Sequence, residues 1–157
     1  KYYEFVKGEE YKNSFINLTI TYGYSDFIEM LSRIALEKVV ERISEISEQG
    51  KVRILFNEEI KINNKKGDLL KTCDVILFTN ETVEVIRIVP MELDIINVNN
   101  DDESMILGIG VIDKFATQMD CKYINLTVIQ PNLITTSIYE TSINKFLHEY
   151  DFSLIWS

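Results

Sequence analysis

Apolar residues recur along the chain with two different spacings, and the change from one to the other predicts alternating helices and strands. Residues 26–50 carry them every three or four positions, which is the pattern of an amphipathic helix, and Gly50 is a typical residue just past a helix end. Residues 102–119 and 142–150 have the same spacing. The sequence therefore predicts one long helix and two shorter ones.

Other segments alternate apolar and polar residues or are apolar throughout, as strands of a packed sheet are. Turns rich in Asn, Gly and Thr, at residues 63–68 and 79–82, separate three of these segments. Residues 135–141 fit neither spacing clearly. We expect a strand at each of five places, the second of them bent at Asn57: residues 15–21, 52–62, 73–78, 83–89 and 123–130.

The order of these elements predicts the fold class. Three successive strands with short turns form an antiparallel meander, and the helix at 102–119 has the length of a crossover that places the next strand parallel to one of them. We expect an α/β (α+β) fold with an αβββαβ core and a mixed central sheet flanked by helices. Residues 1–157 are interpreted as a single domain, with a core at about 26–130 and a C-terminal helix and tail at 131–157.

The 157-residue chain has a formal net charge of −9, and its charges are unevenly spread. Residues 51–71 carry 6 basic and 3 acidic residues, whereas residues 72–121 carry 2 basic and 10 acidic ones. The basic ribbon comprises Lys51, Arg53, Lys61, Lys65, Lys66 and Lys71, and the acidic loop comprises Glu92, Asp94, Asp101, Asp102 and Glu103. A negative protein repels phosphate backbones, so nucleic acid would have to bind at the ribbon, and a basic protein at the acidic loop.

Several function classes find no support in the sequence. It contains no run of 18 or more apolar residues and opens with no basic and apolar leader, so we expect a cytoplasmic protein without a membrane partner. Cys73 and Cys121 are expected to be buried free thiols, and with the single His148 they form no zinc-binding pattern. We therefore expect no metal and no cofactor. The oligomeric state is left open.

Two longer stretches carry a family resemblance. "EEIKINNKKGDLLKTCDVILFTNETVEVIRIV" and "LTVIQPNLITTSIYETSINKFL" resemble the strand meander and the C-terminal motif of RecB-like proteins of the PD-(D/E)XK nuclease superfamily, in particular a phage and prophage family of unknown function. The resemblance covers about residues 30–150. It implies a restriction-endonuclease-like fold and, in active members, Mg²⁺-dependent cleavage of DNA.

The catalytic residues that the resemblance implies are only partly present. The first motif acid falls on Asp74, and a glutamate that opens the meander falls on Glu58 or Glu59. The acid and the lysine of the Asp-x-Lys motif fall on Arg87 and Val89. The family also has a glutamine and a tyrosine in the next helix. This chain has Ser104 and Gly108 at those two positions, so both are lost.

These losses shape the functional expectation. A Mg²⁺ site needs converging carboxylates, and an arginine at one ligand position instead brings a positive charge that can pair with Asp74. We expect a catalytically degenerate nuclease-like domain that binds a protein partner and serves phage DNA recombination, replication or inhibition of host defence. Two alternatives stay open: an acidic DNA mimic, and an active metal-dependent nuclease with a displaced site built from Asp74, Glu84, Glu59 and Lys71. If Glu84 is not part of such a displaced site, we expect it to be a solvent-exposed strand residue.

Overall fold

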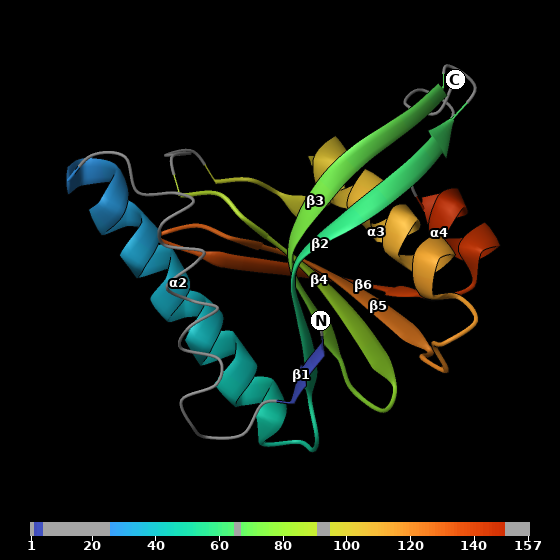
Figure 1. Ribbon diagram of the computed structural model, residues 1–157, viewed down its shortest axis with the longest axis horizontal. Coiled ribbons are helices and arrows are strands. Elements are labelled where there is room, and N and C mark those ends of the chain that lie inside the picture. Colours follow the sequence, from blue (N-terminus) through green and yellow to red (C-terminus); the bar gives the residue numbers. More distant parts are fainter. Residues whose placement is uncertain (1, 5–25, 65–66, 91–94, 150–157) are drawn as a thin grey trace.

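A six-stranded mixed sheet forms the centre of the structure, a computed structural model that describes residues 2–4, 26–64, 67–90 and 95–149 (Figure 1). The strands lie side by side in the order of the sequence, and every neighbouring pair is antiparallel except β4 and β5, which are parallel. Their bounds are β1 Tyr2–Glu4, β2 Arg53–Asn64, β3 Gly67–Phe78, β4 Thr82–Ile88, β5 Tyr123–Ile129 and β6 Ile134–Glu140.

Helices cover both faces of this sheet. Helix α2 (Asp26–Ser47) lies on one face, and α3 (Asp102–Phe115) and α4 (Ile143–Glu149) lie on the other (Figure 1). A single 3-10 turn, η1 (Val98–Asn100), precedes α3. Two apolar clusters result, because the side chains of a strand point alternately to its two faces. Val83 and Val85 belong to the cluster beneath α3, whereas Ile86 belongs to the one beneath α2.

Strands β2 and β3 are longer than the rest and reach past the other strands as a two-stranded arm (Figure 1). Strand β4 pairs only with the part of β3 from Val75 to Phe78, which leaves the preceding part paired with β2 alone. The ladder is interrupted at Asn57, which has a φ of 50°. Asparagine tolerates this left-handed conformation better than most residues, so it permits the bend that the sequence predicts there.

The predicted fold class is confirmed: an αβββαβ core with a mixed sheet flanked by helices, consistent with a restriction-endonuclease-like fold. The crossover through α3 places β5 parallel to β4, as expected. Strands β2 and β3 stay paired as far as Asn64 and Gly67, so their connection is shorter than the turn predicted at residues 63–68. The expected strand at 15–21 lies outside the described residues.

Several boundaries differ from the prediction, and β3 already begins at Gly67, six residues before the expected start at Cys73. The ambiguous stretch at 135–141 largely coincides with the edge strand β6, Ile134–Glu140, so the sheet continues beyond the expected core limit at residue 130. Helix α3 ends at Phe115 and not near residue 119, and the chain continues as a turn in which the amides of Gln118 and Met119 both donate to the Phe115 carbonyl. In the described part of the chain, no helix is both long enough and apolar enough to cross a membrane.

Candidate functional site

The end of β4 carries the motif positions that the nuclease resemblance singles out. Arg87 donates through Nε and Nη2 to Asp101 Oδ2, at 3.0 and 2.5 Å, and Asp101 also accepts the hydroxyl of Ser104 at 2.6 Å. The carboxylate of Asp74 accepts the backbone N–H of Ile88 at 2.8 Å. Charge at this strand end is therefore organised around an ion pair between β4 and the start of α3.

The remaining residues of the displaced-site alternative point to different parts of the molecule. Lys71 Nζ lies 2.5 Å from Glu103 on the α3 side, whereas Glu84 turns to the α2 side of the sheet. The backbone carbonyl of Glu59 accepts a hydrogen bond from Lys114 at 2.6 Å. Across the described residues, no three His, Cys, Asp or Glu side chains gather closely enough to hold a metal ion.

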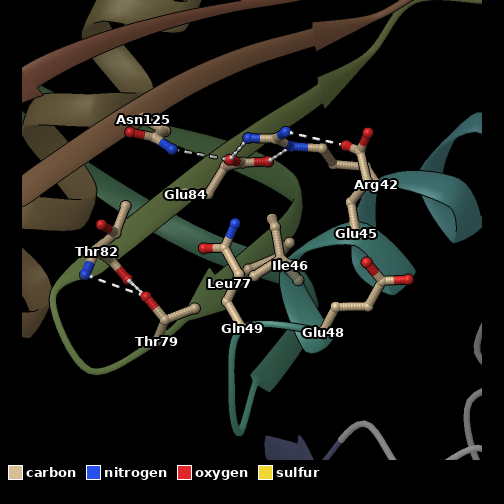
Figure 2. Close-up of a pocket in the computed structure, with 10 residues that line it drawn as sticks. All are labelled: Arg42, Glu45, Ile46, Glu48, Gln49, Leu77, Thr79, Thr82, Glu84 and Asn125. Atoms are coloured by element: carbon tan, nitrogen blue, oxygen red, sulfur yellow. Dashed lines mark hydrogen bonds and ion pairs between the residues drawn. The ribbon is translucent and has the colours of Figure 1, made fainter.

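Glu84 is buried, with 2% of its surface exposed, so the expectation that it is a solvated strand residue is wrong. Its two carboxylate oxygens accept hydrogen bonds from Arg42 of α2, from Nη2 at 2.6 Å and from Nε at 2.8 Å (Figure 2). Asn125 of β5 donates to the same carboxylate at 3.1 Å. Helix α2 is thus joined to the two central parallel strands by one charged contact.

This contact lies in a cleft of about 460 Å³ between the C-terminal half of α2 and the β3–β4 hairpin, which we call the Glu84 cleft (Figure 2). Among the described residues, its charged lining consists of three acids, Glu45, Glu48 and Glu84, and one cation, Arg42. The hydrogen bonds that Arg42 donates to Glu84 raise the pKa of its guanidinium above the usual value, and burial partly opposes this. The lining therefore has two more formal negative charges than positive ones.

The acidic loop is only partly a free surface. Asp101 has 10% of its side chain exposed and forms an ion pair with Arg87, and Glu103 forms one with Lys71. Asp102 is exposed. Glu92 and Asp94 lie outside the described residues. Asp101 is therefore partly exposed and already paired, and the sequence could not reveal its ion pair with β4.

The basic ribbon is divided between the two ends of the long strand β2. Lys51 and Arg53 line a second cleft near the end of β3, whereas Lys61 lies far along the arm, 3.1 Å from Asp68. Eight residue steps along β2 separate Arg53 from Lys61, which corresponds to at most roughly 26 Å because the strand is bent between them. Lys65 and Lys66 lie outside the described residues. The described cations of the ribbon therefore do not form one continuous basic surface.

Both cysteines are free thiols, as expected, although only Cys73 is fully buried and Cys121 is half-buried. Burial raises the pKa of Cys73 far above its usual value, and the nearby Asp74 raises it further. Burial also raises the pKa of Cys121, with a contribution from Asp120. Neither environment favours the reactive thiolate.

Sequence reasoning did not find Arg42 or Asn125. The available signal was Arg42 itself, a cation on the apolar face of the long helix, together with an acid inside an apolar strand. Charged residues at such positions are usually paired, so Glu84 was a suitable partner. Nothing in the sequence indicated which of the basic residues would meet Glu84.

Comparisons with known proteins add a family but no activity. One solved structure, described as "Crystal structure of SSO0001", aligns with 92% of this chain and 68% of its own, at 14% identity and a TM-score of 0.41, which is too low to support an argument. Among curated proteins, no significant match was found. Residues 3–152 match the family described as "Protein of unknown function (DUF2800)". Since this match spans almost the whole chain, the protein belongs to the DUF2800 family.

Proposed function

We propose that this protein is a catalytically degenerate nuclease-like domain that binds a protein partner in the cytoplasm and does not cleave DNA. The proposal rests on the resemblance to RecB-like PD-(D/E)XK proteins. That resemblance also suggests a phage or prophage setting and a role in DNA recombination, replication or inhibition of host defence.

The observation that carries the proposal is the Arg87–Asp101 pair. In an active site of this kind, the second motif acid would bind Mg²⁺ beside Asp74, and the motif lysine would help to position water. Here the acid position is a guanidinium that donates two hydrogen bonds to Asp101, and the lysine position is the apolar Val89, which packs against the core. A fixed cation at a ligand position opposes the binding of a divalent cation, because like charges repel.

A cleavage assay tests the proposal. The purified chain is incubated with linear single-stranded and double-stranded DNA in the presence of Mg²⁺ or Mn²⁺, and the products are separated on a denaturing gel. We expect no cleavage above a reaction that contains EDTA.

The matched variant is Asp74→Asn, which removes the remaining motif acid and keeps its shape. Metal-dependent cleavage by the natural chain that Asp74→Asn abolishes would overturn the proposal. Such a result would favour the displaced nuclease.

A further inference from the structure

The Glu84 cleft is lined mainly by groups that attract a cation. Glu45 is exposed on the last turn of α2, Glu48 is exposed in the turn that follows this helix, and Glu84 of β4 lies buried between α2 and β5. All three nitrogens of the Arg42 guanidinium already donate to carboxylates, two bonds to Glu84 and one to Glu45 at 3.3 Å. An anionic ligand would therefore meet an excess of negative charge and a cation whose nitrogens are all engaged.

A second observation concerns a hydrogen-bond acceptor that lines the same cleft. The side-chain oxygen of Asn125 is buried and has no hydrogen-bond partner among the described residues, although its amide nitrogen donates to Glu84. Buried amide oxygens are satisfied in most proteins, so an unsatisfied one calls for a donor. Figure 2 shows this oxygen turned away from Glu84 and Arg42, so a ligand rich in N–H groups would satisfy it only after the Asn125 side chain turns.

Exposed apolar side chains continue from the cleft along the same face of the sheet. Ile138 of β6 lies directly opposite Asn125 in the strand register and is 65% exposed. Tyr123, two residues before Asn125 on β5, points to the same face and is 40% exposed. An acidic cleft therefore adjoins an apolar surface on strands β5 and β6.

We propose that the Glu84 cleft receives an arginine or lysine side chain of a protein partner, and that apolar residues next to this side chain pack on Tyr123 and Ile138. This inference rests on the proposed function, because it names the surface and the chemistry of partner binding. Charge complementarity favours the basic side chain, and the exposed apolar pair favours a peptide over a small amine.

The test uses two short peptides as probes and NMR as the readout. Acetyl-Leu-Arg-Leu-amide and acetyl-Leu-citrulline-Leu-amide have the same shape, but only the first carries a charge. Each is titrated into the full chain while the backbone amide shifts of Arg42, Glu84 and Asn125 are followed. We expect the arginine peptide to shift these signals with an affinity that falls as salt is raised, and the citrulline peptide to bind at least about tenfold more weakly.

Variants locate the effect in the cleft. Glu45→Gln with Glu48→Gln removes two negative charges from the lining and leaves the Arg42–Glu84 pair in place. This double variant should lower the affinity for the arginine peptide about tenfold. The control is Asp68→Asn with Asp113→Asn, which changes the net charge equally on exposed residues of the arm and of α3, outside both the Glu84 cleft and the acidic loop. The control should leave the affinity unchanged.

Three results would overturn the inference. These are equal binding of the two peptides, equal weakening by the two double variants, and contacts in NOE spectra that place residues 5–25 of the same chain in the cleft. Cleavage in the nuclease assay is a separate outcome, which would overturn the proposed function without altering the titration. A failed titration of a protein that does not cleave DNA would overturn only the assignment of the cleft.

Discussion

At the scale of single residues, the Arg42–Glu84 pair is the most demanding contact in the described structure. Both groups give up water, and the cost of dehydrating a buried charge can exceed the attraction within the pair. The bidentate geometry and the third hydrogen bond from Asn125 offset part of that cost. The pair therefore matters more for fixing the position of α2 over β4 than for net stability.

Removing one member of the Arg42–Glu84 pair should lower the stability of the protein more than replacing both members. Arg42→Met leaves the buried Glu84 carboxylate without its cation, and we expect the free energy of unfolding to fall by about 3 kcal/mol. Arg42→Met with Glu84→Leu replaces the pair by apolar groups and should recover most of this loss. Urea unfolding followed by circular dichroism measures both values, and a double variant less stable than Arg42→Met would contradict the argument.

At the scale of elements, the close approach of α3 to the sheet depends on two glycines. A Cβ atom at Gly110 would lie 2.2 Å from Ile60 Cγ2, and one at Gly108 would lie 2.7 Å from Leu126 Cδ2. Atoms cannot approach so closely, so a larger residue would push the helix from the sheet or displace these side chains. Gly110 meets the branched part of an isoleucine on the arm, whereas Gly108 meets the movable end of a leucine.

Gly110→Ala should destabilise the protein although alanine is the better helix former. The gain in helix propensity is about 1 kcal/mol, whereas overpacking of a tight core costs about 1–3 kcal/mol, and a contact of 2.2 Å belongs at the upper end. We expect a net loss of about 1–2 kcal/mol by thermal or urea unfolding. Gly108→Ala is the comparison and should lose less. An increase in stability for Gly110→Ala would show that α3 can move outward freely.

Much of this element structure could be predicted from spacing alone, because each long helix and strand buries one face and so repeats its pattern many times. Strand β6 could not, since Thr135, Thr136 and Ser137 interrupt its apolar alternation, and its place is fixed by pairing with β5. The Glu84 cleft could not be predicted either. Its members come from α2 and the turn after it, from the β3–β4 hairpin and from β5, and only the tertiary fold brings Arg42 to Glu84.

At the scale of the whole molecule, the net charge of −9 is accompanied by extensive pairing of the basic residues. Lys71, Arg87 and Lys114 each meet a carboxylate across the contact between α3 and the sheet. Lys61 is paired on the arm itself. Binding of DNA phosphates would require several of these contacts to be exchanged against a repulsive overall field.

We therefore expect weak binding of DNA. In a fluorescence anisotropy titration with a labelled 20-base-pair duplex in about 150 mM salt, the dissociation constant should be no tighter than about 10⁻⁴ M, the weak end of non-specific binding. Lys61→Glu should change it little. Tight binding that Lys61→Glu weakens strongly would instead assign nucleic-acid recognition to the arm.

The parallel pairing of β4 with β5 also constrains how the chain reaches its native state. The β2–β3 and β3–β4 hairpins can form from neighbouring residues, but Thr82 meets Tyr123 only after the whole crossover through α3 has been completed. Closing such a loop is slow relative to closing a hairpin, because chain entropy is lost before contacts are gained. Until then β4 presents an unpaired, mostly apolar edge at what becomes the middle of the sheet, and such edges recruit other chains. During synthesis, the period between the emergence of β4 and that of β5 is thus when aggregation is most probable, and pulsed hydrogen exchange should show amides of β2 and β3 protected before those of β5.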